Sequence, residues 1–403
     1  MTLLKLALRN LLGAGLRTWL NVFVLSLSFV LIIFSRGLIQ GMNRQAETSM
    51  IAAEIGGGHF QHPAYDPYDP LTLPDAHGPL PPSLAALAAA GRAAPVLVTQ
   101  GTIYPGGRLF TVLVKGIDPG QAVLDLPTAF LGAAPSTADG EVPVLVGSRM
   151  ARTAGLVKGD SFTLQWRDAR GTFDALDAVV AEVFSTSVQT VDAGQVWVPL
   201  ERLRRMTGLP GEATFAVLAS DAAGAPGAPG APPPPDAGGW VFRSRDDFLA
   251  DLRGMVGAKT VGSGVMSVIF LALAMLAIFD TQVLSIFRRR REMGTLMALG
   301  FTRGRVVALF TLEGLLNGVL AGLVAAVYGV PLLAWVARTG WAMPADVDSY
   351  GFAIGDRLFP AFGAGLVAGT TLLVLLATAV VSFLPTRKIA KLKPTDALRG
   401  RTP

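Results

Sequence analysis

The chain has 403 residues, of which 51% are hydrophobic and 16% are charged, and its mean hydropathy is +0.49. Because typical soluble domains carry ~25% charged residues, this balance excludes an ordinary soluble protein and indicates a membrane protein. The absence of cysteine excludes a disulfide framework, a thiolate metal site and a cysteine nucleophile. The formal net charge of +5 would suit a nucleic-acid partner only if the basic residues covered a folded surface.

Four stretches are long and apolar enough to span a bilayer, which requires ~20 residues. They predict transmembrane helices at residues 18–39, 261–287, 306–337 and 359–384. Residues 1–17, which include Lys5, Arg9 and Arg17, predict a cytoplasmic amphipathic entry helix. Because no small-residue cleavage site follows the first span, we interpret that span as an uncleaved signal anchor rather than a signal peptide.

The basic residues gather beside the spans on one side of the membrane. Lys and Arg dominate the entry helix, the loop 288–305 and the tail 385–403, where acidic residues are rare. The short loop 338–358 and the large region 40–260 contain more acidic than basic residues. By the positive-inside rule, both termini lie in the cytoplasm, and the large region lies in the periplasm outside the inner membrane. This arrangement removes the reason to expect nucleic-acid binding.

The region 40–260 predicts an α+β extracytoplasmic domain inserted between the first and second of four transmembrane helices. Its two ends are amphipathic and are expected to extend the neighbouring membrane helices. Runs of β-branched and aromatic residues predict strands at 95–104, 109–118, 160–166, 176–185 and 213–220. Segments that end at glycine predict short helices at 82–91, 147–155 and 200–208. Two proline-rich pieces interrupt the domain, an irregular loop at 62–82 and a low-complexity insert at 223–239.

Motifs for catalysis are missing or incomplete. The segment "GMVGAKT" at 254–260 lacks the spacing of a phosphate-binding G-x-x-x-x-G-K-[ST] loop. Ser148 lacks the G-x-S-x-G context of a hydrolase nucleophile. His59 and His62 stand near two aspartates and are open to two interpretations, a metal site or a polar loop; we favour the loop, because no further ligand pattern accompanies them. The sequence therefore predicts no enzyme activity, no cofactor and no metal in this chain.

Small residues recur at four-residue spacing in the last two predicted spans. Such spacing lets helix backbones approach closely and favours helix packing in lipid. The residues concerned are Gly314, Gly318 and Gly322 in the third span and Gly365 and Gly369 in the fourth. Asp280 and Glu313 lie near the cytoplasmic ends of the second and third spans. We interpret these acids as solvated, or paired with Arg288 or Arg305, rather than as a transport relay.

The stretch "RRRREMGTLMALGFTRGRV" at 288–306 resembles the cytoplasmic loop of the FtsX/MacB/LolC-LolE family of ABC transporter permeases. In that family an arginine-rich segment and Glu-hydrophobe-Gly open a short coupling helix, and Ala-Leu-Gly closes it. The beginning "LALRNLLGAGLRTWLNVF", the ending "PTRKIAKLKPTDALRG" and the segment "VLVGSRMARTAGLVKGDSFTLQ" are similar to further signatures of the family. "GHFQ" at 58–61 looks most like the lipoprotein-releasing LolE-type branch, whereas the insert 223–239 departs from the family pattern.

The resemblance implies a permease subunit whose cytoplasmic loop binds a separate ABC ATPase. The coupling helix would be formed by Arg291, Glu292, Met293, Gly294, Leu296, Met297 and Gly300. Its apolar side, with Met293, Leu296 and Met297, needs a protein groove because so short a helix is unstable alone in water. The arginine run could instead be a solvated loop that only sets topology.

The resemblance also implies the partners and the activity. Two ATPase copies would hold ATP and Mg²⁺, and a second copy of the permease or a related permease would complete the transporter. The expected activity is release of a lipoprotein or other amphiphilic substrate from the inner membrane and its lipids, through mechanotransmission to the periplasmic domain. A MacB-like drug or peptide exporter and an FtsX-like regulator of an outer-side hydrolase or sensor remain alternatives.

Overall fold

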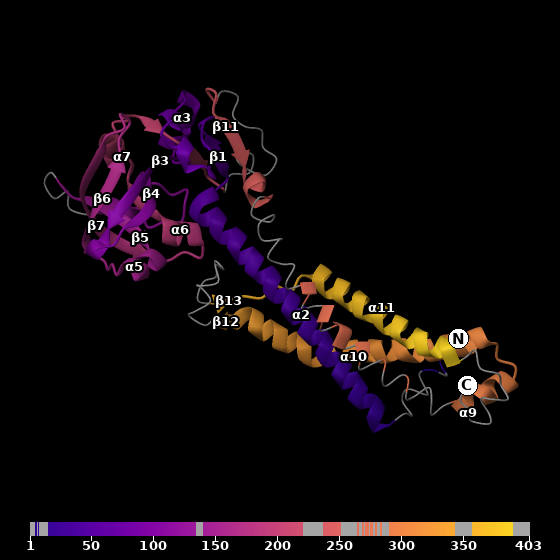
Figure 1. The fold of residues 1–403 in the computed structure, drawn as a ribbon. Helices are drawn as coiled ribbons and strands as arrows, with labels where there is room; N and C mark the ends of the chain where they lie inside the picture. The colour runs from indigo at the N-terminus through magenta and orange to yellow at the C-terminus, as the bar shows by residue number, and fades with distance from the viewer. Residues whose placement is uncertain are drawn as a thin grey trace. The chain divides into compact units, whose positions relative to one another are not determined.

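The computed structural model describes residues 15–133, 140–220, 237–250, 290–342 and 357–389, together with Lys5, Ala7 and single residues between 264 and 283. The chain divides into two compact units (Figure 1). The first, here called the helical unit, comprises residues 1–43, 257–342 and 357–403. The second, the outer unit, comprises residues 44–256 and 343–356. The sequence placed the corresponding boundaries at residues 40 and 260.

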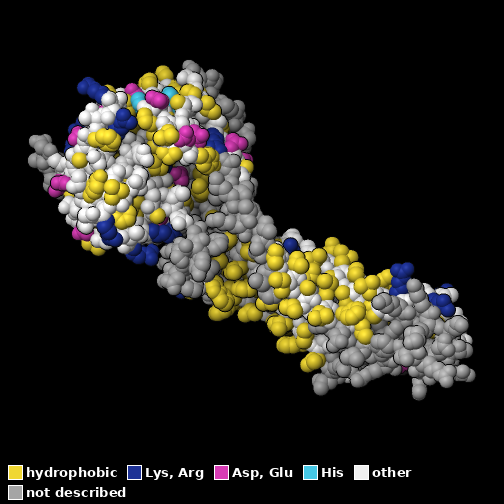
Figure 2. Space-filling model, viewed as in Figure 1, with side chains coloured by type: hydrophobic (Ala, Val, Ile, Leu, Met, Phe, Trp, Pro, Cys, Tyr) yellow, Lys and Arg dark blue, Asp and Glu magenta, His cyan; other side chains and the backbone are white. Residues whose placement is uncertain are grey.

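Three described helices are long and apolar enough to cross a membrane. They are α2 (Leu16–Met50), α10 (Arg303–Thr339) and α11 (Ala364–Ile389). Figure 2 shows hydrophobic side chains gathered over the surface of the helical unit, which is what lipid contact requires. The predicted second span, 261–287, lies mostly outside the described residues, as do Asp280, Arg288 and most of the entry helix.

Three boundaries of α2 and α11 differ from the predicted spans. α2 continues well past residue 39 and passes into a five-residue π-helical turn, Ile51–Ile55, as the amphipathic pattern after the first span suggested. α11 begins at Ala364 rather than 359, because Pro360 disfavours helical backbone in the residue before it. Its start is preceded by a short antiparallel pair, β12 (Trp341–Ala342) with β13 (Arg357–Leu358). α11 also continues through Pro385 to Ile389, beyond the predicted end at 384.

In the described residues, α2, α10 and α11 of the helical unit are held together by an apolar cluster and a few polar contacts. Val22, Phe29 and Ile32 of α2 pack with Ala321 of α10 and Val374 of α11. Between α2 and α10, the hydroxyls of Ser26 and Tyr328 are 3.2 Å apart and share a hydrogen bond. The backbone N–H of Ala361 donates to the Gly37 carbonyl over 2.9 Å, which ties the segment before α11 to α2. These contacts fix α2, α10 and α11 as one packed group.

Strand pairing in the outer unit closes on itself. In the described residues the order is β11-β1-β10-β3-β4-β8-β5-β7-β6, and β6 pairs back onto the second half of β3. The strands are β1 (Gly58–Gln61), β3 (Ala93–Tyr104), β4 (Phe110–Ile117), β5 (Val142–Gly147), β6 (Ser161–Arg167), β7 (Phe173–Phe184), β8 (Gln195–Pro199), β10 (Phe215–Leu218) and β11 (Val241–Ser244). A two-stranded pair, β2 (Gly78–Pro79) with β9 (Glu212–Ala213), lies apart from this sheet.

The ring formed by β3, β4, β8, β5, β7 and β6 separates two of the hydrophobic cores of the outer unit, and the alternation along β4 and β8 assigns side chains to one or the other. Val112 and Val114 of β4 and Val196 of β8 belong to the first core. Trp197 of β8 belongs to the second core, which is also lined by Ala53 from the π-helical turn. The end of α2 therefore covers one face of the sheet of the outer unit.

Short helices connect the strands: α3 (Pro82–Ala89), α4 (Ala129–Ala133), α5 (Ser148–Ala154), α6 (Gln189–Gly194) and α7 (Leu200–Thr207). The predicted helices at 82–91, 147–155 and 200–208 correspond to α3, α5 and α7. Each predicted strand likewise coincides with an observed one, but β1, β8 and α6 were not predicted. In the proline-rich loop the structure has turns, a 3₁₀ turn at Pro70–Thr72 and the short strand β2. Residues 223–236 of the second proline-rich piece lie outside the described residues.

Candidate functional site

The segment between the second apolar stretch and α10 forms the short helix α9 (Arg290–Ala298), as predicted. Gly300 follows with φ of +93°, a left-handed conformation that glycine adopts without steric cost. The N–H of Gly300 donates to the Met297 carbonyl over 3.1 Å, and the N–H of Phe301 donates to the Leu296 carbonyl over 3.0 Å. This pair of bonds is a Schellman C-cap, and Leu296 and Phe301 both pack against the buried residues Val306 and Phe310. Gly294, expected to mark the other end, lies buried inside α9 instead.

The apolar side of α9 packs against its own chain. Leu296 and Met297 are half-buried against Val306 and Phe310, which are fully buried residues of α10. We expected Leu296 and Met297 to enter a groove on a partner, but these contacts already cover part of both side chains. The side chains of Arg291 and Met293 lie outside the described part of the structure.

The outward side of the same segment carries different residues. Glu292, Thr295 and Ala298 are exposed on α9, and Leu299, directly after the helix, is 74% exposed. A large apolar side chain held at a rigid helix cap offers a contact point to a protein partner. Sequence reasoning missed Leu299, although the cap predicted at Gly300 could have located it.

The predicted packing glycines separate into two groups. On α10, Gly314 is buried, a Cβ at Gly318 would lie 3.1 Å from Leu375 Cδ2 of α11, and a Cβ at Gly322 would lie 3.9 Å from Phe29 Cζ of α2. On α11, Gly365 and Gly369 are exposed, and nothing in the described chain lies within 4 Å of a Cβ built on either.

A further glycine on α10 was not predicted. A Cβ on Gly329 would lie 2.7 Å from Val30 Cγ2 of α2, which is closer than real Cβ atoms approach. The small residues of α10 therefore serve its contacts with both α2 and α11.

The other residues that were considered for catalysis, transport or metal binding lie within structural elements or contacts of the fold. Glu313 is buried on α10. His59 lies in the buried strand β1, so its assignment to a polar loop was wrong, whereas His62 lies in the loop beside Trp240. Ser148 begins α5 and hydrogen-bonds to Asp192. In the described ranges, no group of three or more His, Cys, Asp or Glu side chains could hold a metal ion.

One comparison, with protein-family models, matches the part of the chain that contains α9, α10 and α11. Residues 264–394 match the family model described as FtsX-like permease C-terminal. A 156-residue stretch, 36% of this chain, is 29% identical to an uncharacterized ABC transporter permease of Methanocaldococcus jannaschii and covers 36% of that protein. A 155-residue stretch, 38% of this chain, is 30% identical to the macrolide export ATP-binding/permease protein MacB of Chromobacterium violaceum and covers 21% of it.

The chain thus spans little more than a third of the first relative and about a fifth of the second. Both relatives are permeases by name, and the family match covers two of the three described apolar helices. Residues 264–394 therefore match an FtsX-like permease C-terminal domain, and the comparisons support a likeness of this chain to the FtsX/MacB type of ABC transporter permease.

Proposed function

We propose that this chain is the membrane-spanning subunit of an ABC transporter of the inner membrane, in which a separate ATPase drives movement of the outer unit. The observation that carries the proposal is α9, a capped helix between the second apolar stretch and α10 that leaves Leu299 exposed. The sequence contains no complete phosphate-binding loop, which is consistent with ATP and Mg²⁺ binding to a partner. Two ATPase copies, and a second copy of this chain or a related permease, would complete the assembly.

We propose a different set of residues in and after α9 for the contact with the ATPase. Leu296 and Met297 stabilise the packing of α9 on α10, so they orient the segment. Leu299, together with the exposed side of α9, makes the contact. Burying a leucine side chain on binding contributes ~1.5–3 kcal/mol. A carboxylate at that position would replace this gain by the cost of burying an unpaired charge, several kcal/mol in effective terms.

The experiment is co-purification of the chain with an ABC ATPase of the same genome, expressed together with it. Leu299→Asp should keep expression and membrane insertion at the level of the parent and lose most of the bound ATPase. Leu71→Asp is a matched control, because Leu71 is 83% exposed and lies in the outer unit, where no ATPase contact is proposed. Full recovery of the ATPase with Leu299→Asp would contradict the assignment of this segment.

For the substrate, we propose a lipoprotein or another amphiphile that is released on the outer side of the inner membrane. The support is the likeness of the segment "GHFQ" to the lipoprotein-releasing branch. The test is ATP-dependent release of a triacylated lipopeptide from proteoliposomes that contain the chain and its ATPase.

Export of a small molecule is the second candidate, and the match to a macrolide exporter favours it. Under that alternative, the lipopeptide would stay in the vesicles while the chain conferred macrolide resistance on a sensitive host. An FtsX-like regulator would show neither activity.

A further inference from the structure

The end of α2 is attached to the sheet of the outer unit through a buried ion pair. Lys115 Nζ of β4 lies 2.6 Å from Glu54 Oε1 of the π-helical turn that follows α2. The Lys115 side chain is 3% exposed and the Glu54 side chain 20% exposed. Gln195 of β8 donates a second hydrogen bond to the same Glu54 oxygen over 3.0 Å. One carboxylate thus joins the end of α2 to two neighbouring strands.

The local structure explains why these side chains meet. Lys115 alternates with Val114, which points into the first core, so Lys115 points to the opposite face, where Ala53 of the turn packs. Within the π-helical turn, the Gly56 N–H bonds to the Ile51 carbonyl over 2.8 Å, five residues back. This wider turn changes the direction of the side chains relative to an α-helix that continued unchanged. It brings Glu54 to the sheet.

The neighbouring side chains restrict how the charged groups of Lys115 and Glu54 can be placed. Lys115 Nζ lies 5.2 Å from the ring centre of Trp197 and 5.8 Å from that of Phe215, so aromatic rings occupy other directions around it. The ring of His59 lies parallel to that of Phe215 at 4.8 Å. His59 Nε2 is 2.9 Å from the backbone carbonyl of Glu54, and because a carbonyl only accepts, Nε2 is the donor. The backbone and the side chain of Glu54 are therefore both held.

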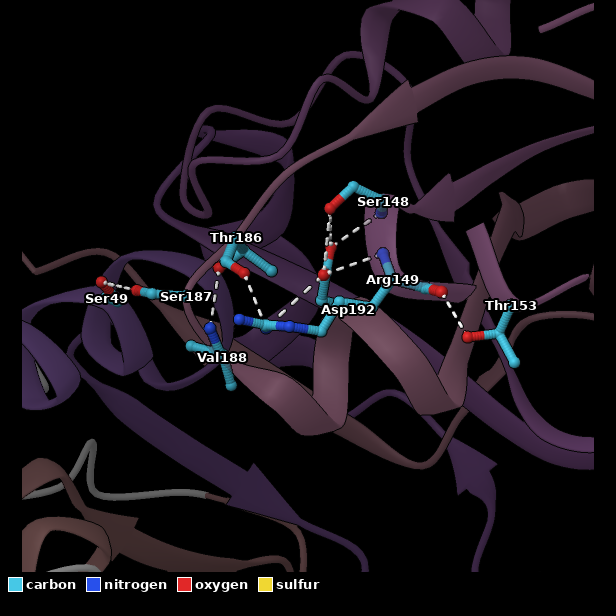
Figure 3. A network of polar contacts seen from close by, with 8 residues as sticks. All are labelled: Ser49, Ser148, Arg149, Thr153, Thr186, Ser187, Val188 and Asp192. Atoms are coloured by element: carbon cyan, nitrogen blue, oxygen red, sulfur yellow. Dashed lines mark hydrogen bonds and ion pairs between the residues drawn. The ribbon is translucent and has the colours of Figure 1, made fainter. Parts of the chain in front are cut away.

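A second attachment joins α2 to the segment that follows β7 (Figure 3). Ser49, near the end of α2, shares a hydrogen bond with Ser187, which follows β7. The neighbouring Thr186 carbonyl accepts from Arg149 Nη1 over 3.4 Å, and Arg149 pairs with the buried carboxylate of Asp192 over 3.5 Å. Because Thr186 and Ser187 are adjacent in the chain, the two groups of bonds in Figure 3 together link α2 with α5 and α6.

Asp192 is rigidly placed in this network. It accepts the backbone N–H of Ser148 over 2.8 Å and that of Arg149 over 3.1 Å, and so caps α5 from α6. A Cβ on Gly147 would collide with the backbone of Asp192, so only glycine permits this approach. The part of the outer unit that contacts the end of α2 is therefore itself held in place by these bonds.

A buried ion pair is weak support for stability, because the desolvation of both charges offsets their attraction. It does penalise every arrangement in which the two groups separate, since each would leave a buried charge unpaired. Rotation of α2 about its axis, or sliding by one residue, would separate Glu54 from Lys115. The pair therefore fixes the rotation and register of the helix end on the sheet.

We propose that Glu54 and Lys115 are positioning residues that make the end of α2 and the sheet of the outer unit one rigid body. α2 is continuous from Leu16 to Met50, so a movement of its membrane-spanning part passes to the sheet without slippage at this joint. The role assigned to the joint in transport rests on the proposed function; its rigidity does not.

The absence of native cysteine allows spin labels at chosen positions in the full chain. Thr48→Cys on α2 and Ala175→Cys on β7 are both exposed and belong to the outer unit. Double electron–electron resonance in lipid nanodiscs then measures the distribution of distances across the joint. Glu54→Gln combined with Lys115→Met removes both charges and leaves none unpaired, so the fold is retained. We expect the distance distribution to become about twofold broader, because neutral side chains tolerate several arrangements.

Lys158→Met with Glu182→Gln is the matched control. The Lys158 Nζ–Glu182 Oε2 distance is also 2.6 Å, but Lys158 is 58% exposed and the pair does not involve α2. The distance distribution of this control should be as narrow as that of the parent chain. A joint variant that also keeps that width would overturn the proposal.

A second measurement separates the joint from the proposed function. In proteoliposomes with the ATPase, the joint variant should hydrolyse ATP at the rate of the parent while lipopeptide released per ATP falls by about fivefold or more. Unchanged release per ATP, despite a broadened distance distribution, would overturn the role of the joint in coupling. A parent that binds no ATPase would instead overturn the proposed function, and the rigidity of the joint would still be decided by the distance measurement.

Discussion

Alanine substitutions at three membrane glycines should have effects of different sign, in an order set by the space around each glycine. At Gly365, nothing in the described chain lies within 4 Å of an added Cβ. At Gly318, the nearest atom, Leu375 Cδ2, lies at 3.1 Å, and at Gly329 the nearest atom, Val30 Cγ2, lies at 2.7 Å. All three residues are in helices of the helical unit; Gly318 and Gly329 are inside α10, whereas Gly365 is the second residue of α11 and gains least in helix propensity.

The magnitudes follow from two opposing terms. Replacing glycine by alanine inside a helix stabilises it by up to ~1 kcal/mol. Forcing an extra methyl group into a packed contact costs ~1–3 kcal/mol. Gly365→Ala should therefore stabilise the chain by up to ~1 kcal/mol, because only the propensity term applies. Gly318→Ala should be near neutral, because the end of the Leu375 side chain can move by a few tenths of an ångström. Gly329→Ala should destabilise by ~1–2 kcal/mol, because Val30 is stiff and held in the apolar cluster.

The assay is thermal unfolding of the three variants in the same detergent. A difference of ~2–3 kcal/mol between Gly365→Ala and Gly329→Ala corresponds to roughly 5–10 °C in midpoint. Finding Gly365→Ala as destabilising as Gly329→Ala would refute the reasoning, because it would mean that Gly365 contacts a packed surface.

The remaining predictions concern the outer unit. Lys115→Met alone should destabilise the outer unit by ~3–5 kcal/mol, far more than the double neutral variant, because the Glu54 charge is left buried without its partner. Hydrogen exchange of the β4 amides measures the difference in stability between the two variants. Equal destabilisation by both variants would exclude the buried pair. Burial lowers the pKa of His59 to about 4, against the opposing effect of its hydrogen bond to Glu54. A lowered folded-state pKa means that stability is complete above pH 6.5 and falls by ~3 kcal/mol as the pH approaches 4. His59→Phe should flatten this dependence in an acid unfolding series, whereas His62→Asn should retain most of it. Gly147→Ala should cost ~1–3 kcal/mol through its collision with Asp192, read by the midpoint of thermal unfolding.

Local patterns were sufficient where a structural element depends on neighbouring residues. Hydropathy located α2, α10 and α11, since each helix needs only a sustained apolar run to partition into lipid. Gly300 predicted the end of α9, because the Schellman cap uses bonds within six residues. Longer strands such as β3 and β7 were found for the same reason, their alternation being long enough to recognise.

Short elements were missed because their signal was too weak. β8 has five residues and β1 only four, and each owes its strand conformation to partners on both sides. His59 illustrates the consequence: beside Gly and Pro it resembled part of a loop, yet pairing with β10 and β11 buries it.

Glycine spacing was ambiguous for a different reason. Gly318 and Gly365 belong to the same sequence pattern, but only Gly318 meets a neighbouring helix. A four-residue spacing marks one face of a helix; which face meets another helix depends on how the helices are rotated in the folded chain. The same limit applied to α9, where the sequence identified an apolar side and the structure placed Leu296 against α10 and Leu299 outside.

The sequence by itself determined the apolar helices, the capped helix α9 and the α+β character of the outer unit, because each depends on residues close together in the chain. Tertiary structure alone decided the pairing of Glu54 with Lys115, which are separated by 61 positions. No local pattern relates a carboxylate at the end of a helix to a lysine in the middle of an apolar strand. They meet because the closure of the sheet and the π-helical turn place both on one buried face, where each charge requires the other.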